Sequence, residues 1–514
     1  MLRISHFSKR QWLTLIVFSI ADFCNAICVS LQAPFYPLEA EKKGATATEY
    51  GLVFGVFELV VFIISPIYGK HLNRIGPKYL FNGGIFTTGI CAILFGFLDK
   101  VDGHYPFIIL SFVIRIIEAM GNAAFLTASF AIIAMEFPDN VATTFASLET
   151  FFGLGLIVGP TVGGALYGIG GYVTPFVVLG STLFLSAIMT AFALPDHPNR
   201  RNDVTSDASL LQVLKIPGVL LAAASIIVTS MSIGFLSATL EPHLRQFNLS
   251  PMVLGLMFVI NGGTYALTAP WWGWLCDKVV PAKVVTLLGC IILMIGFSLI
   301  GPVPFLNRPT DLSVTIIGLV LHGMGIGAQL VASFTDALRT AVQYGFSNSL
   351  ETYGLISGLW TSTFALGAFI GPSIAGVLYD VVGFGAATVF VIVLSALVGV
   401  AVALFLMFSR PPRLIKDVHN LEELIDPITK SMMENGSAAM PTANGGNRSG
   451  YNGLVSVALS CPVPTERPPG MEGIIACNSY KNRLGTWNRK ESELIIGSNM
   501  SSSYAEETRG LLGP

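Results

Sequence analysis

Twelve stretches of this chain are apolar for long enough to cross a lipid bilayer as helices, which takes about 20 residues. They cover roughly residues 12–34, 50–69, 79–98, 106–134, 141–168, 173–194, 217–240, 252–275, 283–304, 313–335, 351–378 and 384–408. Composition agrees, because 53% of the residues are hydrophobic and 12% are charged, against about 25% charged in soluble domains. The sequence therefore predicts an all-α membrane protein with twelve transmembrane helices.

The composition also excludes several classes of function. The chain has 29 Lys and Arg against 31 Asp and Glu, so it lacks the basic field of a nucleic-acid-binding protein. Its seven cysteines show no CxxC pair and no Cys/His spacing typical of metal sites. It also has no phosphate-binding loop and no Ser/His/Asp set. We therefore expect no enzyme activity, no cofactor or metal, and no nucleic-acid partner.

Basic residues predict which side of the membrane each loop faces, because Lys and Arg accumulate on the cytosolic side. With a cytosolic N-terminus, the inner segments hold fifteen Lys or Arg near the membrane and the outer loops hold five. We therefore expect both termini in the cytosol. The expected parts are a cytosolic N-terminus (1–11), an N-terminal six-helix half (12–194), a cytosolic central loop (195–216), a C-terminal six-helix half (217–409) and a disordered cytosolic tail (410–514).

Two motifs occur twice, each time six helices apart. The fifth segment carries Gly155, Gly159, Pro160, Gly163 and Gly164, and the eleventh carries Gly367, Gly371 and Pro372 at an offset of 212 residues. Segments two and eight end in the second motif, with Gly69, Asn73 and Arg74 in one copy and Gly273 and Asp277 in the other. Small residues four apart let helices approach closely, and a Gly-Pro pair bends a helix. We interpret the chain as two related six-helix halves, although packing alone would also explain the glycines.

The same motifs resemble those of a known family. Residues 69–78 resemble the loop signature of the major facilitator superfamily, with Asn73 where that family usually has Asp. Residues 115–121 resemble its fourth-helix signature, and residues 155–164 are similar to the signature of its drug:proton antiporters. Resemblance to the vesicular amine transporters (solute carrier family 18), and most of all to their polyamine-transporting branch, lies in residues 34–37, 39–44, 140–143, 147–150, 175–180, 240–242 and 336–339. It covers about residues 9–412 and implies the major facilitator fold and transport of organic amines.

Charged residues inside the predicted helices are few and mostly acidic. Each costs at least ~2.5 kcal/mol at the centre of a membrane helix, so each needs a reason. The acids are Asp22, Glu58, Glu118 and Glu149, with Asp336 at an inner helix end, and the single base is Arg115. Five acids against one base favour a cationic solute or protons and disfavour anions.

Two predicted helices carry polar faces. One face of the first helix holds Asp22, Asn25, Val29 and Gln32, and one face of the fourth holds Arg115, Glu118 and Asn122. The first face is interpreted as the lining of a pathway or as a hydrogen-bonded packing stripe. The resemblance implies an amine-binding acid at the position of Asn25, and Asp22 lies one turn earlier. Arg115 and Glu118 are expected to pair, either structurally or to tune the protonation of a nearby acid.

Glu149 lies in the middle of the fifth segment, eleven residues before Pro160. The resemblance implies an acid eleven residues before the proline of the eleventh segment, where this chain has Thr361. The repeat makes Glu149 and Thr361 equivalent, so we infer that the acid has moved to the other half. The monoamine transporters also have a lysine on the second helix, where this chain has Phe57 and Glu58. A lost base and a gained acid suit a substrate with more than one positive charge.

The remaining candidates lie at helix ends or are aromatic. Glu241, which precedes Pro242, is expected either to form an outer gate or release site or to be a rim carboxylate. Asp336 with Arg339 is expected to cap or latch the inner end of the tenth helix. Aromatic side chains that could offer cation–π faces, or serve only packing and the membrane interface, include Tyr265 and Trp360.

These features together predict a secondary active transporter that exchanges protons for organic cations by alternating access, loading polyamines such as spermine or spermidine into vesicles. A plasma-membrane multidrug:proton antiporter is the alternative, and a channel or a non-transporting scaffold is a remote one. Short tail motifs at 451–454 and 507–512 fit sorting signals, which favours secretory, synaptic or endolysosomal membranes and sorting adaptors as partners. We expect a monomer whose other partners are the bilayer, the amine and protons.

Overall fold

Helix boundaries follow local sequence signals. Ser8 caps α1 (Lys9–Lys42) and Thr46 caps α2 (Ala47–Ile75), and each forms a capping box with the residue three positions on. Gly76, at a φ of 98°, ends α2 in a conformation that favours glycine. Pro77 then begins α3 (Pro77–Gly96), where its missing N–H costs nothing.

The computed structural model describes residues 7–193, 210–249, 251–301, 303 and 310–408, and within them the chain forms only helices. After α3 come η1 (Phe97–Lys100), α4 (His104–Glu136), α5 (Val141–Gly170), α6 (Val173–Ala193), α7 (Leu210–Leu214), α8 (Pro217–Leu244), η2 (Arg245–Phe247), α9 (Pro251–Lys278), α10 (Ala282–Ile300), α11 (Leu312–Gln343) and α12 (Leu350–Phe408). Most of the predicted central loop and all of the predicted tail lie outside the described residues, so the predicted part boundaries remain predictions.

Eleven helices in the described residues are long and apolar enough to cross a membrane. The prediction of an all-α multi-pass membrane protein is therefore confirmed, whereas the number twelve is not. The last two predicted segments fall in one helix, α12, whose 59 residues would measure about 88 Å if straight, far more than a bilayer core of about 30 Å. Its backbone leaves the helical conformation at Gly383, with a φ of 75°, at the point where the sequence predicts a loop.

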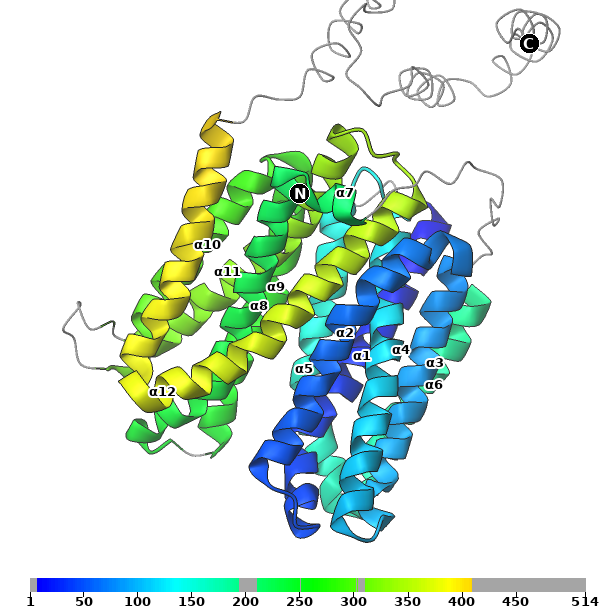
Figure 1. Ribbon diagram of the computed structural model, residues 1–514, viewed down its shortest axis with the longest axis vertical. Helices are drawn as coiled ribbons and strands as arrows, with labels where there is room; N and C mark the ends of the chain where they lie inside the picture. The colour runs from blue at the N-terminus through cyan, green and yellow to red at the C-terminus, as the bar shows by residue number, and fades with distance from the viewer. Residues whose placement is uncertain (1–6, 194–209, 250, 302, 304–309, 409–514) are drawn as a thin grey trace, which may run out of the picture. The chain divides into compact units, whose positions relative to one another are not determined.

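Helices α1–α6 form one group and α8–α12 another, and the two groups lie beside each other (Figure 1). Both groups use the repeated glycine motif in the same way. Gly155 and Gly159 let α5 approach the backbone of α1 at Phe23 and Ile27, where a Cβ atom would lie within 3.0 Å of backbone oxygens. The same motif at Gly367 and Gly371 lets α12 approach α8. The internal repeat therefore produces equivalent helix pairs.

Not every glycine of the motif works this way. An added Cβ at Gly164 would meet no atom within 4 Å, whereas one at Gly163 would strike Leu31 of α1. Pro160 and Pro372 lie inside α5 and α12 without ending either helix. The close approach therefore depends on the glycines spaced four apart.

The second repeated motif joins the two groups. Gly69 on α2 lies against the backbone of Gly354 on α12, and Gly273 on α9 lies against the backbone of Ala142 on α5. In both places a Cβ atom would come within 2.5 Å of a carbonyl oxygen. We call the end of the bundle that carries residues 69–78 and 273–283 the motif end.

The apolar cores show where the groups meet. One large cluster combines residues of both groups and extends to the motif end, where it includes Leu72, Ala142 and Cys276. Toward the opposite end, each group has a cluster of its own, one built only from residues 23–179 and the other only from residues 235–392. The two groups are therefore packed together at the motif end and have separate cores at the opposite end.

Candidate functional site

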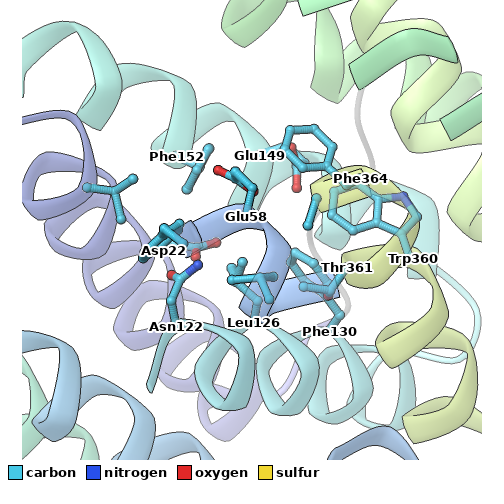
Figure 2. Close-up of a pocket in the computed structure, with 14 residues that line it drawn as sticks. Asp22, Glu58, Asn122, Leu126, Phe130, Glu149, Phe152, Trp360, Thr361 and Phe364 are labelled. Carbon is cyan, nitrogen blue, oxygen red and sulfur yellow. The ribbon is translucent and has the colours of Figure 1, made fainter. Parts of the chain in front are cut away.

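A pocket lies between the two groups (Figure 2). Four helices of the first group line it, and α12 of the second group closes it. Its polar lining consists of Asp22, Glu58, Asn122, Glu149 and Thr361, and none of the residues that line it is basic. The cavity measures about 60 Å³, enough for a few water molecules at about 10–15 Å³ each. The pocket thus gathers three of the acids predicted from sequence.

Asp22 on α1 is the most deeply buried of these acids. Its side chain is 1% exposed, and neither carboxylate oxygen has a hydrogen-bond partner among the described residues. A buried carboxylate without a partner is costly, so Asp22 requires either a proton or a cationic donor. The geometry makes Asp22 an open acceptor facing the pocket.

Glu149 on α5 is held from the other group of helices. Tyr265 on α9 donates its hydroxyl hydrogen to Oε2 of Glu149. Gly153, one turn along α5, makes room for this ring, because an added Cβ there would lie 3.3 Å from it. The bond joins the two groups directly at the pocket. The sequence indicated Tyr265 only as one of several aromatic residues, because nothing in it reveals which acid the hydroxyl meets.

The predicted pair on α4 forms next to the pocket. Arg115 Nη1 donates to Oε2 of Glu118 at 3.0 Å, and Gln32 of α1 donates to the other carboxylate oxygen at 2.6 Å. Both charged side chains are buried, at 3% and 0% exposed. The guanidinium also lies 4.2 Å from the ring centroid of Phe57, which lines the pocket. The pair therefore contacts the pocket wall without lining the pocket.

The polar face of α1 divides between two surroundings. Asp22 and Val29 line the pocket. Asn25 instead donates to Asn122 of α4 at 2.9 Å, and Gln32 reaches Glu118. Two residues of the predicted stripe thus face the cavity, while the other two tie α1 to α4.

Aromatic rings close the pocket on the side of the motif end. Trp360 lines the pocket and makes edge contacts with Phe130 and Phe145, at 5.1 and 5.3 Å between ring centroids. Phe334 of α11 stacks on Phe145 at 4.4 Å. These four rings come from both groups of helices, so we call them the aromatic seal. The sequence analysis missed three of them, because apolar residues in an apolar helix give no signal of their partners.

Two predicted acids lie away from the pocket. Glu241, near the end of α8, is paired with Arg245 one turn on, at 2.8 and 2.9 Å. Asp336 on α11 meets Lys283 of α10 at 2.5 Å. Arg339 binds Asp277 and the carbonyl of Cys276 on α9 instead. Asp336 and Arg339 thus link α11 to two different helices.

Asp277 anchors the motif end. Its buried carboxylate accepts hydrogen bonds from the backbone N–H groups of Ala142 and Thr143 at 3.2 and 2.8 Å, and from the hydroxyl of Thr143 at 2.7 Å. An acid is favoured there because the first N–H groups of a helix point at it. Arg339 adds an ion pair at 2.8 Å. The other copy of the motif has Asn73 and Arg74 at its end, and both are exposed.

Replacing Asp277 by asparagine should loosen the motif end. Hydrogen bonds to a charged group contribute about 1.5–3 kcal/mol each, so backbone amides at the start of α5 should exchange with deuterium roughly 10- to 100-fold faster. Hydrogen–deuterium exchange of the full protein in nanodiscs measures this. Asn73→Ser is the control and should leave exchange unchanged. Equal exchange in Asp277→Asn and the wild-type protein would contradict the role of Asp277.

Comparisons with known proteins identify the family and the fold. The family model of the Major Facilitator Superfamily matches residues 18–350 and 224–443. The human MFS-type transporter SLC18B1 is 38% identical over 410 residues, which are 79% of this chain and 89% of that protein. The rat chromaffin granule amine transporter is 28% identical, over 65% of this chain and 61% of its own. The crystal structure of the human organic anion transporter MFSD10 superposes with a TM-score of 0.59 at 16% identity, covering 76% and 99% of the two chains.

The family match and the relatives named as transporters make this chain a multi-pass membrane transporter rather than an enzyme. The chain belongs to the major facilitator superfamily. Within it, the chain is similar to SLC18B1 and more distantly related to the vesicular amine transporters, as the sequence motifs indicated.

Proposed function

We propose that this protein exchanges protons for organic cations, with polyamines as the main substrates. The observation that carries the proposal is the pocket itself, in which Asp22, Glu58 and Glu149 face one small space that no basic residue lines. Such a site attracts cations and repels anions. Each carboxylate can hold either a proton or an ammonium group, so the two cargoes compete. Competition for the same groups gives obligatory exchange without a separate coupling device.

Three acids suit a substrate with several positive charges better than one with a single charge. A monoamine neutralises one carboxylate and leaves two buried negative charges to be protonated. A polyamine carries ammonium groups along a flexible chain and can neutralise more than one acid at once. The aromatic lining, with Trp360 and Phe364, supplies rings for the alkyl segments and for cation–π contact. The similarity to SLC18B1 and to amine transporters supports the same choice.

The packing of the two groups supports alternating access. The pocket is closed toward the motif end by the aromatic seal and the Asp277 contacts, and the groups have separate cores at the opposite end. In the cycle we propose, the motif end faces the cytosol, both termini are cytosolic, and the opposite end faces the lumen of a vesicle. Release of the seal and of Asp277 would expose the pocket to the cytosol. Because the cavity is only about 60 Å³, it must widen to admit an organic cation.

Uptake of labelled spermine into proteoliposomes tests the proposal. With an acidic interior, we expect uptake that stops when a protonophore collapses the gradient. No uptake, or uptake indifferent to the protonophore, would refute proton exchange. A bulky lipophilic cation in parallel tests the alternative of a multidrug antiporter, which the aromatic lining also suits. If the lipophilic cation is taken up and spermine is not, the polyamine assignment is wrong.

A further inference from the structure

A second buried polar cluster lies inside the group α8–α12, outside the pocket. His322 on α11 is 1% exposed, and both of its ring nitrogens have partners. Nδ1 lies 2.8 Å from Nδ2 of Asn261 on α9, and Nε2 lies 3.3 Å from Oγ of Ser232 on α8. The proposed exchange at the pocket uses none of these residues. Three helices therefore converge on one buried histidine that has no assigned purpose.

Within the part of the chain that the structure describes, the contacts of the His322 ring are with neutral side chains. Ser232 comes from α8, Asn261 from α9, and Phe297 from α10, whose ring meets the imidazole edge-on at 4.8 Å. Beyond these contacts, the next titratable groups along α9 are Tyr265, one turn from Asn261, and Glu149, to which Tyr265 donates a hydrogen bond. An ion pair thus does not hold His322 in either protonation state.

The cluster is linked to the pocket through α9. Gly323, next to His322, lies so close to α9 that an added Cβ would be 2.4 Å from the carbonyl oxygen of Asn261 and 3.1 Å from the backbone nitrogen of Tyr265. Asn261 and Tyr265 are four residues apart and share one face of the helix. A change at His322 therefore acts on the same stretch of backbone that positions the Tyr265 hydroxyl at Glu149.

We propose that His322, with Asn261 and Ser232, forms a proton-binding site in the second group of helices, separate from the carboxylates of the pocket. The inference rests on the proposed proton exchange and adds one proton to it. In this state the Asn261 amide donates to Nδ1, and Nε2–H donates to Ser232. A proton that arrives forms an Nδ1–H bond, and the Asn261 amide turns over so that Oδ1 accepts it. No covalent bond other than N–H is made or broken.

The three residues meet the needs of both charge states. A buried imidazolium is tolerated only if each N–H finds an acceptor. Oδ1 of Asn261 is one acceptor, since an amide offers both donors and an acceptor. Oγ of Ser232 is the other, because its own hydrogen already goes to the carbonyl of Thr229 at 2.7 Å. A neutral imidazole needs one acceptor and one donor, and a partner that can turn over, such as this amide, serves the charged ring as well.

The proton enters from the end opposite the motif end. Asn261 is half-buried, and it lies one turn nearer that end than Tyr265. The two groups of helices have separate cores there, whereas the aromatic seal closes the other side. His322 therefore binds its proton in the state described here and releases it after the groups rearrange.

The number of protons exchanged per amine tests the proposal. In voltage-clamped proteoliposomes with fixed pH and spermine gradients, the zero-flux potential gives this number. His322→Gln and Asn261→Leu should each lower it by one proton. His243→Gln is the matched control, because His243 is also buried in this group but bonds a backbone carbonyl, that of Ile300. It should keep the wild-type number. If His322→Gln does not fold, the proton number of Asn261→Leu alone tests the proposal.

Unchanged numbers in His322→Gln and Asn261→Leu would overturn the proposal. Wild-type uptake that ignores the pH gradient would refute the proposed function instead. In that case histidine ring NMR of the protein in nanodiscs decides, with the His322 signal assigned by its absence from the variant. The signal should show that the ring takes up a proton as the pH is lowered. A ring that stays neutral down to the lowest pH at which the protein remains folded would contradict the site.

Discussion

Replacing Glu149 by glutamine should abolish acid-driven uptake of spermine while leaving the helices packed as they are. Glutamine has the same shape, and its amide oxygen can still accept the hydroxyl of Tyr265. Contact between α5 and α9, including the bond from Thr150 to the carbonyl of Ala266 at 2.8 Å, is also kept. What is lost is the ability to carry a charge or a proton. Since Glu149 is 5% exposed and faces the pocket, we expect uptake to fall to that of empty liposomes.

The control for this variant is Glu136→Gln at the end of α4. Glu136 meets Arg10 at 2.8 Å and lies outside the pocket, so uptake should stay near the wild-type rate. Tracer uptake and thermal unfolding of both variants in detergent are measured side by side. Normal uptake by Glu149→Gln would place the exchange site elsewhere in the molecule. If Glu149→Gln loses uptake and also unfolds at a clearly lower temperature than the wild-type protein, the role of Glu149 is structural instead.

Replacing Arg115 by methionine should destabilise the protein strongly. Glu118 is fully buried, and without the guanidinium its charge would keep only the neutral Gln32 as partner. Removing one partner of a buried ion pair costs about 3–5 kcal/mol, because an uncompensated charge remains. The midpoint of thermal unfolding in detergent should therefore fall clearly below that of the wild-type protein.

The double variant Arg115→Met with Glu118→Leu tests whether the unpaired charge of Glu118 causes the loss of stability. It removes both charges, and apolar replacements of a buried pair are often neutral or stabilising. The double variant should regain most of the lost stability. If the single variant unfolds like the wild type, the ion pair is not what stabilises this part of α4. If the double variant is stable but does not transport, the pair also serves the neighbouring pocket wall.

Much of the fold follows from the sequence because hydrophobic length and glycine spacing are local signals. The apolar stretches predicted the membrane helices, and the repeated glycines predicted equivalent close contacts in both groups. The exception is α12, where the last two predicted segments form one long helix with a turn at Gly383. One glycine with a φ of 75° was enough for the turn. The sequence predicted a short loop there, and the structure has only this turn.

The site was only partly predictable. Membrane acids are so costly that Asp22, Glu58 and Glu149 were conspicuous, and all three line one pocket. The partners of these acids could not be predicted, because contacts between helices far apart in sequence depend on how each helix is rotated and tilted. Thus Tyr265 could not be matched to Glu149, nor Lys283 to Asp336. Neutral polar residues such as His322 give a weaker signal still, since their cost in a membrane disappears once they are hydrogen-bonded.

Proton release on amine binding tests the central claim most directly, namely that amine and protons compete for the pocket carboxylates. Spermine is added to the purified protein in weakly buffered detergent solution, and a pH-sensitive dye reports the protons set free. We expect the wild-type protein to release protons in proportion to bound spermine, and Asp22→Asn and Glu149→Gln each to release fewer. Binding of spermine without any release of protons by the wild-type protein would contradict the account.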